Sequence, residues 1–170
     1  MTRSAVLVGV DIVEADRIGR TVSDGGAAYG RRVTTPAERE LHAGSPLADA
    51  ASFAVKESFI KAVGGRAAGF DWHDFEERGE EQRWAAPLLA EAASALGASI
   101  ELTLTTGASI ELTLTTGASY TIRGASRRAA LARLAPQEND APVAGAARWG
   151  LGAGLLVALA IVTVDSKGAL

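Results

Sequence analysis

The chain is 170 residues long, which suits one compact domain, and its formal net charge is −3. A net negative charge argues against broad nucleic-acid binding, and the absence of cysteine excludes disulfides, zinc–thiolate sites and thiol nucleophiles. The chain contains 35 alanines, 19 glycines and only 5% aromatic residues. Small side chains fill little volume, so the core must rely on close backbone approach or on surface buried in an oligomer.

The first predicted element is a buried strand at residues 5–10, a short β-branched run that ends at Asp11. This run is too short for a signal peptide and has no cleavage site behind it, so we expect a cytoplasmic protein. Residues 12–20 are predicted to be helical. Residues 22–30 are rich in glycine and are predicted to form a loose connection.

Two helices are predicted next. Thr35-Pro36-Ala37-Glu38 has the features of a helix start, because threonine is a good N-cap, proline suits the first helical position and glutamate completes a capping box. This helix is expected to end near Gly44. Residues 46–63 have the clearest helical pattern of the chain, and the Gly64-Gly65 pair ends it.

The next elements along the chain are shorter. Residues 70–76 alternate apolar and polar side chains as far as His73, which indicates a strand with a bulge or an end there. Residues 84–96 are predicted to be an alanine-rich helix and residues 124–135 a basic helix. Residues 136–148 are predicted to be a linker.

A ten-residue segment recurs without change, because residues 97–106 are repeated at residues 107–116. Each copy has the pattern of a strand, and its Gly-Ala-Ser, which occurs a third time at residues 117–119, is predicted to make a turn. The repeat is too short for a solenoid and indicates a tandem duplication. An insertion of an even number of residues leaves the side chains of the following strand on the same faces of the sheet. We therefore expect the two copies to form two antiparallel strands, or one strand and a protruding hairpin, remote from Asp11 and Glu57.

The last apolar run, residues 151–164, is interrupted by Gly152 and Gly154 and followed by Asp165. It is short for a membrane span, which needs about 20 residues. The pattern favours a buried central strand over a membrane tail, and we expect no membrane partner.

Glu57 lies in an apolar stripe of the 46–63 helix, between Phe53 and Ile60 at helical spacing. A carboxylate on the buried face of a helix is costly unless a charged group meets it. The alternative is a surface ion pair with Lys61, one turn further along the helix. Spacing alone does not decide between the two.

Asp11 and Glu57 are a candidate pair of oxygen ligands for a hard cation such as Mg²⁺. Mg²⁺ usually takes one or two carboxylates and leaves its other positions to water and to substrate phosphate. Lys61 is placed one turn beyond Glu57, and the Gly64-Gly65 pair could let the backbone approach a phosphate. These residues together indicate a site for a phosphate compound.

The same segments resemble a known family. Residues 8–18, which include Val-Gly-Val-Asp-Ile-Val-Glu and Arg-Ile, resemble the opening of the holo-acyl-carrier-protein synthase family, the small type of 4′-phosphopantetheinyl transferase. Residues 53–64, Phe-Ala-Val-Lys-Glu-Ser-Phe-Ile-Lys-Ala-Val-Gly, resemble its second motif. Residues 35–38 resemble its Thr-x-x-Glu, and residues 70–76 its aromatic, Asp-containing strand. Because the order and spacing agree across residues 5–76, the chain is identified as a divergent member of this family.

The resemblance implies a fold and an assembly. The fold is a small α+β domain over residues 1–170, in which an antiparallel sheet packs with helices. Three copies form a homotrimer with active sites at the subunit interfaces, which fits the small-residue core. The implied partner is an acyl, polyketide or peptidyl carrier protein, and no nucleic-acid partner is expected.

The resemblance also implies roles for single residues. Asp11 and Glu57 match the Mg²⁺ ligands, and Lys61 matches the lysine that meets the phosphates of coenzyme A. Arg17 matches a basic position that contacts the acidic recognition helix of the carrier protein, and Arg32 lies in a similarly basic stretch.

The implied reaction is attack by a carrier-protein serine hydroxyl on the β-phosphate of coenzyme A, with loss of 3′,5′-ADP. Mg²⁺ and Lys61 would stabilise the phosphate charge, and either Glu57 or a held water would accept the serine proton. The chain departs from the family at Ser52, where a basic residue is common, and at residues 149–152, where the family has a Ser-x-Ser/Thr-His segment. The alternative function is therefore that of a catalytically weak or inactive member that binds a carrier protein or a partner subunit.

Overall fold

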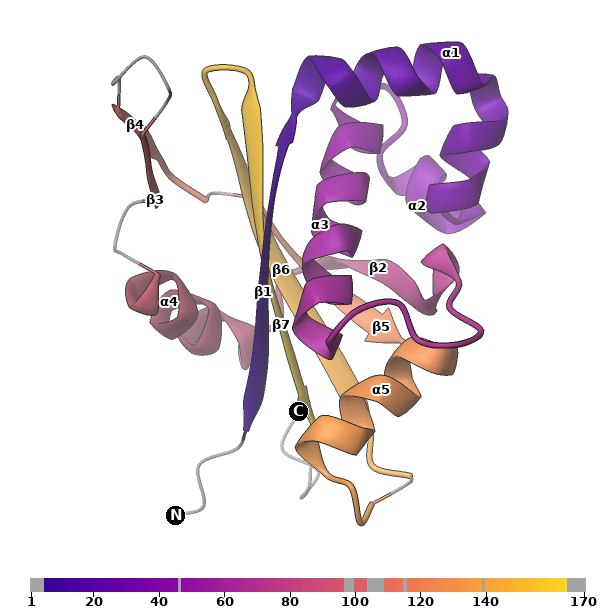
Figure 1. Cartoon of the computed structure of the whole chain (residues 1–170), viewed down its shortest axis with the longest axis vertical. Coiled ribbons are helices and arrows are strands. Elements are labelled where there is room, and N and C mark those ends of the chain that lie inside the picture. Colours follow the sequence, from indigo (N-terminus) through magenta and orange to yellow (C-terminus); the bar gives the residue numbers. More distant parts are fainter. Residues whose placement is uncertain are drawn as a thin grey trace.

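The computed structural model of the chain describes residues 5–45, 47–96, 100–103, 109–114, 116–138 and 140–164. Its main feature is a five-stranded antiparallel sheet in the order β1-β7-β6-β5-β2 (Figure 1). The strands are β1 (Val6–Glu14), β2 (Phe75–Glu80), β5 (Thr116–Ile122), β6 (Val143–Gly152) and β7 (Leu155–Val164). An antiparallel sheet packed with helices confirms the predicted α+β class.

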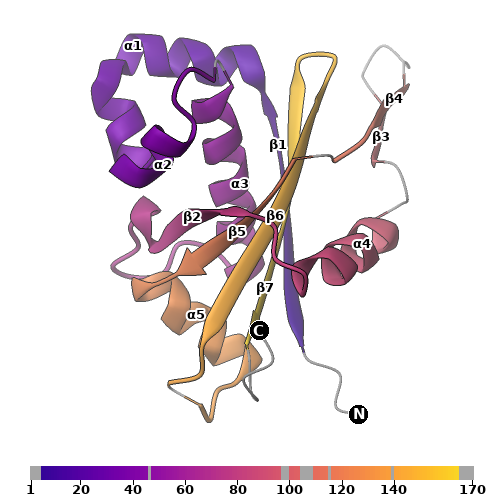
Figure 2. The ribbon, with the colours of Figure 1, turned by 180° about the vertical axis from the view of Figure 1, so that it is seen from behind.

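The helices are divided unequally between the two faces of the sheet. One face carries α1 (Ala15–Val33), α2 (Pro36–Leu41), α3 (Ala48–Val63) and α5 (Gly124–Leu134), and the other carries α4 (Ala85–Ala95) (Figures 1 and 2). A short 3-10 helix, η1 (Trp72–Asp74), precedes β2. No helix in the described part of the chain is both long enough and apolar enough to cross a membrane.

The main core lies between the sheet and α3. Phe59 of α3 is fully buried, and its ring stacks on Phe75 with centroids 5.1 Å apart and tilts against Tyr120 at 4.9 Å. Aromatic pairs at this spacing stabilise a core beyond the area that they bury. A second, smaller cluster lies under α4 and includes Leu89 and Leu159, both fully buried.

The helix α4 and the sequence repeat lie within a single connection. Strands β2 and β5 pair antiparallel although residues 81–115 separate them. Within this connection β3 (Ile100–Thr103) and β4 (Ser109–Leu112) form a separate two-stranded antiparallel sheet on the α4 side (Figure 2). The predicted antiparallel pairing of the two copies is confirmed, whereas residues 97–99 and 104–108 of the repeat lie outside the described residues.

The predicted helix starts and spans are largely confirmed. At α2 the Thr35 hydroxyl accepts from the Glu38 N–H at 3.2 Å, and the Glu38 carboxylate accepts from the Thr35 N–H at 2.7 Å, so the capping box is complete. The helices α3, α4 and α5 fall within the predicted ranges 46–63, 84–96 and 124–135. Pro46, the predicted start of α3, lies outside the described residues.

Two predictions for the N-terminal segment were wrong. Residues 12–14 are strand rather than helix, because β1 pairs with β7 along its whole length as far as Glu14. Residues 22–30 are helical rather than a loose connection, and only Gly26 has non-helical angles, with φ 59° and ψ −164°. Packing of α1 against α3 outweighs the local glycine signal.

The predicted linker at residues 136–148 was wrong beyond residue 142. Strand β6 begins at Val143 and pairs on both sides, with β5 and β7. Residues 117–119 likewise belong to β5 rather than to a turn. Alanine and glycine give a weak strand signal, and pairing with two neighbouring strands decides their conformation.

Two further predictions need partial correction. In residues 70–76 only the last two are strand, because η1 occupies the middle of the segment before β2 begins at Phe75. The apolar run at residues 151–164 contains a hairpin turn at Ala153-Gly154, both with positive φ. Residues 151 and 152 before this turn are the end of β6, and the residues after it are β7, an interior strand that is buried as predicted.

Candidate active site

The site begins where β1 meets α3, and Gly9 makes their contact possible. A Cβ at position 9 would overlap the Ser58 carbonyl oxygen and lie 2.6 Å from the Ala62 backbone nitrogen. No other residue allows this approach, because every other side chain begins with that carbon. This is the close backbone approach expected of a chain rich in small residues.

Asp11 lies two residues after Gly9, so its side chain points from the same face of β1, toward α3. Its Oδ1 accepts a hydrogen bond from Lys61 Nζ at 2.6 Å. Its Oδ2 is buried and has no hydrogen-bond partner among the residues that the structure describes. The Asp11 side chain is 10% exposed and that of Lys61 53%, so the carboxylate faces inward and the cation faces solvent.

Glu57 does not pair with Lys61, so the surface pair that helical spacing left open as an alternative is not formed. Its Oε1 accepts from Arg66 Nη2 at 2.5 Å instead. The Glu57 side chain is 19% exposed, between the buried and the surface alternatives. Arg66 lies over two aromatic rings, with its guanidinium carbon 5.5 Å from the Phe70 centroid and 4.9 Å from the Trp72 centroid.

The two predicted ligand residues stand on the two elements that meet at this contact, Asp11 on β1 and Glu57 on α3. Asp11 shares its face of β1 with Gly9, and Gly9 abuts Ser58, the neighbour of Glu57. No cluster of three or more His, Cys, Asp or Glu forms within the described ranges. Mg²⁺ needs only one or two protein carboxylates, however, and the buried, unpartnered Asp11 Oδ2 is a free ligand atom.

A buried ion pair between Glu38 and Lys56 supports α3, and sequence analysis did not find it. Lys56 Nζ donates to Glu38 Oε2 at 2.8 Å and to the Val33 carbonyl at 2.7 Å, and both charged side chains are 1% exposed. Glu38 Oε1 also accepts from the Glu77 N–H at 2.9 Å. Burial lowers the pKa of Lys56, and the Glu38 carboxylate opposes that change. Glu38 and Lys56 each belong to a motif that the sequence displays, but no spacing within the sequence indicates that these two motifs contact each other in the fold.

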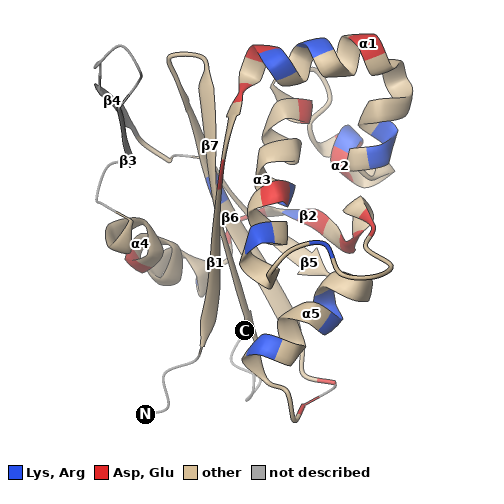
Figure 3. Cartoon of the chain, viewed as in Figure 1, with Lys and Arg blue, Asp and Glu red and all other residues tan. Residues whose placement is uncertain are grey.

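Helix α1 carries both of the predicted partner-binding residues. Arg17 and Arg32 are both exposed, on a helix that carries basic and acidic positions together (Figure 3). Burial raises the pKa of Tyr29, the Glu57 and Asp49 carboxylates raise it further, and Arg17 and Arg32 oppose them. Helix α1 also packs against α3, the helix that carries Glu57.

The two glycines after α3 differ in their surroundings. Gly64 is the C-cap with φ 96°, and Arg133 Nη1 lies 3.2 Å from where its Cβ would be. Gly65 has φ 113°, and nothing in the described part of the chain lies within 4 Å of its Cβ position. Both N–H groups are already used, because that of Gly64 donates to the Lys61 carbonyl at 3.2 Å and that of Gly65 to the Ile60 carbonyl at 2.8 Å.

The end of β6 has no serine, threonine or histidine where the resemblance leads us to expect a Ser-x-Ser/Thr-His segment. Gly150 abuts the carbonyl oxygen of Thr113, where a Cβ would overlap it. Leu151 is 44% exposed. Residues 149–152 therefore contribute no hydroxyl or imidazole group to the site.

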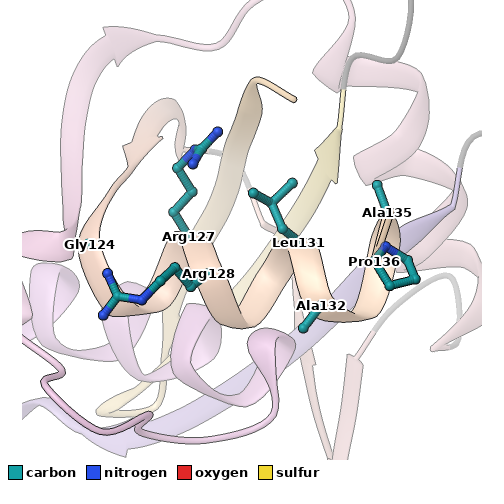
Figure 4. A pocket seen from close by; sticks show the side chains of 7 residues that line it. All are labelled: Gly124, Arg127, Arg128, Leu131, Ala132, Ala135 and Pro136. Atoms are coloured by element: carbon teal, nitrogen blue, oxygen red, sulfur yellow. The ribbon is translucent and has the colours of Figure 1, made fainter. Parts of the chain in front are cut away.

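A separate cavity of about 530 Å³ lies along α5. It is lined by residues between the start of α5 and the turn after it: Gly124, Arg127, Arg128, Leu131, Ala132, Ala135 and Pro136 (Figure 4). None of the predicted site residues lines it. Arg127 is already engaged, because its Nη2 donates to the Ala141 carbonyl at 2.9 Å.

The fold and the candidate site together define a class of protein. In this class the edge strand of an antiparallel sheet presents an aspartate to a helix with the pattern Lys-Glu-(x)₃-Lys. The family model of the 4′-phosphopantetheinyl transferase superfamily matches residues 7–95, which is more than half of the chain. The chain belongs to this superfamily.

The curated relatives described next are both named holo-[acyl-carrier-protein] synthase. Holo-[acyl-carrier-protein] synthase of Vibrio atlanticus is 36% identical over 115 residues, which cover 60% of this chain and 88% of that protein. The enzyme of the same name from Geobacter sulfurreducens is 42% identical over 72 residues, which cover 40% of this chain and 57% of that protein. The chain spans 57–60% of the length of the first four curated relatives that it matches.

Solved structures share the fold at low identity. Holo-[acyl-carrier-protein] synthase of Helicobacter pylori, solved in complex with coenzyme A, is 19% identical with a TM-score of 0.52, over 94% of this chain and 100% of that one. The holo-ACP synthase of Plasmodium yoelii is 15% identical with a TM-score of 0.53, over 95% of each chain. These similarities confirm the fold.

Proposed function

We propose that this chain transfers the 4′-phosphopantetheine arm of coenzyme A to a serine of a carrier protein and releases 3′,5′-ADP. The observation that carries the proposal is the pair of carboxylates at the β1–α3 contact, with Lys61 bonded to one of them, in a member of this superfamily. The name that the relatives share, and the coenzyme A in the Helicobacter pylori structure, support this choice of reaction and co-substrate.

Asp11 and Glu57 would hold Mg²⁺, and Asp11 Oδ2 offers it a free oxygen. Bound there, the ion would supply positive charge to the pyrophosphate oxygens of coenzyme A. Lys61 is half-exposed, so its ammonium can leave Asp11 Oδ1 and donate to the same phosphates. The free space at the Cβ position of Gly65 leaves room for a phosphate near the end of α3.

The reaction forms one bond and breaks one. The serine oxygen attacks the β-phosphorus of coenzyme A, and the bond from that phosphorus to the bridging oxygen breaks, so that 3′,5′-ADP leaves with the bridging oxygen. Glu57 accepts the serine proton as it is lost. Lys61 stabilises the negative charge that develops on the phosphate oxygens.

The carrier protein would dock on α1, where Arg17 and Arg32 are exposed. An acidic helix on the carrier would be attracted to these arginines and steered to the site. The partner is an acyl, polyketide or peptidyl carrier protein, and the family assembly would be a homotrimer in the cytoplasm.

Mass spectrometry of a carrier protein incubated with coenzyme A, Mg²⁺ and this chain tests the proposal. A gain of one phosphopantetheine arm on the carrier is expected, and it should disappear when Mg²⁺ is chelated. A second candidate function, carrier binding without transfer, is favoured by residues 149–152, which supply no hydroxyl or imidazole group. Carrier binding with no mass gain would establish this second candidate.

A further inference from the structure

Arg66 is the residue whose role the proposed reaction leaves open. It lies in the loop after α3, where Gly64 and Gly65 turn the chain back toward the helix. Its guanidinium donates to Glu57 Oε1 at 2.5 Å and lies over the Phe70 and Trp72 rings. The sequence showed none of this, because the only partner of Glu57 that helical spacing offered was Lys61, as one of two alternatives.

Two aromatic rings hold Arg66 in place. Contact of a guanidinium with ring faces adds attraction to an ion pair and orients the planar group. Trp72 is itself buried and packs against Phe70 and Phe53, with ring centroids 5.6 Å and 5.5 Å apart. The rings are thus fixed, and they keep the guanidinium beside Glu57 even though half of the Arg66 side chain is exposed.

Each of the two carboxylates of the site therefore carries a cation from the chain itself, Lys61 on Asp11 and Arg66 on Glu57. The two pairs differ in one respect. Asp11 keeps a second oxygen without a partner, whereas Glu57 has a guanidinium that is stacked beside it. A divalent cation that binds Glu57 must compete with that guanidinium for the same carboxylate charge.

We propose that Arg66 is a competitor of the divalent cation at Glu57 and thereby limits the metal affinity of the site. This inference rests on the proposed function, because it takes Asp11 and Glu57 as the metal ligands. When metal binds, the guanidinium leaves Glu57 but stays over the Phe70 and Trp72 rings. Arg66 is a positioning residue in this scheme, since it acts on the metal through Glu57.

Binding of Mn²⁺ to the full chain, followed by electron paramagnetic resonance of the free ion, tests the inference without any activity measurement. Arg66→Ala is expected to bind Mn²⁺ about fivefold more tightly than the unchanged chain, the size of effect usual for a half-exposed ion pair. Arg66→Gln, which keeps a polar side chain over the rings, should tighten binding in the same direction. A thermal melt of each variant confirms that it is folded.

The matched control is Arg31→Ala. Arg31 is an exposed arginine of α1 whose carbonyl oxygen lies 3.1 Å from His73 Nε2, so it is close to Trp72 and carries the same charge, but it has no contact with Glu57. Its removal should leave the Mn²⁺ affinity within a factor of about two, because exposed charges without contact are screened.

The outcomes separate this inference from the proposed function. Tighter Mn²⁺ binding in both Arg66 variants but not in Arg31→Ala supports it. Unchanged or weaker binding in the Arg66 variants overturns it, and so does equal tightening in Arg31→Ala. In those two cases the metal site itself still stands if Asp11→Asn abolishes the Mn²⁺ binding of the unchanged chain. If neither the unchanged chain nor Arg66→Ala binds Mn²⁺, both the metal site and the inference fail.

Discussion

On one face of the sheet α3 packs through an apolar core together with buried charged groups, whereas on the other face α4 packs through aliphatic side chains. The α3 face contains the buried Glu38–Lys56 pair and the Asp11–Lys61 pair. The α4 face contains alanine and leucine, and α4 leaves Val8 and Ile12 of β1 more than 40% exposed. The residues that carry the family resemblance are thus on the face where charge is buried, and the connection that contains the repeat covers the other face.

This difference shows where the chain can tolerate change. A buried ion pair fixes geometry because breaking it leaves an uncompensated charge, whereas aliphatic packing accepts substitution of similar volume. The Glu38–Lys56 pair ties α2, β2 and the end of α1 to α3, the helix that presents Glu57 and Lys61. In its described residues, the connection between β2 and β5 has no such buried ion pair with the site.

The largest expected effect is on stability, at the buried pair. Glu38→Ala should lower the free energy of unfolding by about 3–5 kcal/mol, because it leaves the Lys56 ammonium buried without its partner. Urea unfolding followed by circular dichroism measures this. The double variant Glu38→Ala/Lys56→Met removes both charges and should recover part of the loss.

The matched control for that prediction lies on the α4 face. Arg148 pairs with Glu81 there through two hydrogen bonds, with side chains 27% and 16% exposed. Arg148→Ala should cost no more than about 1 kcal/mol, since solvent screens this pair. Equal losses in Glu38→Ala and Arg148→Ala would remove the distinction drawn between the two faces.

A smaller effect is expected from the repeat. Deletion of residues 107–116 removes an even number of positions, so the side chains of the remaining strand still point to the same faces of the sheet. The shortened chain should fold, lose about 1–2 kcal/mol of stability and keep its transfer activity. A thermal melt and a transfer assay check this. Loss of folding would show that the second copy is part of the core.

The smallest expected effect is on carrier binding. Arg17→Glu should weaken binding of the carrier protein several-fold, and added salt should weaken binding of the unchanged chain, because both act on exposed charges. Titration of a fluorescent carrier at two salt concentrations measures both. A carrier affinity that neither change alters would contradict the docking of the carrier on α1.

Local sequence rules predicted the elements whose signals are local. The Thr35 capping box and the glycine stop after Val63 involve residues within one turn, and both are present. The rules failed at residues 22–30, where contact with α3 keeps α1 helical around Gly26. They failed also at β6, whose alanine and glycine residues become strand because two neighbours pair with them.

The residue types of the candidate site were proposed from the sequence, but their pairings were not. Asp11, Glu57 and Lys61 were named as the chemistry-bearing residues from their motifs, and these roles stay a prediction. Helical spacing left a Glu57–Lys61 pair open, whereas in the structure each of the two finds a partner outside α3. These partners are brought together by packing between elements that are distant in the sequence, and the spacing of residues within one helix or strand does not reveal such contacts. The Glu38–Lys56 pair was missed for the same reason.

The central claim is that Asp11 and Glu57, at the contact of β1 and α3, carry out phosphopantetheine transfer. The most direct test is the mass of a carrier protein after incubation with coenzyme A, Mg²⁺ and either the unchanged chain or Asp11→Ala, with Arg148→Ala as the folded control. The expected result is a gain of one phosphopantetheine arm with the unchanged chain and with Arg148→Ala, and none with a folded Asp11→Ala. Transfer by Asp11→Ala at nearly the unchanged rate would contradict the claim.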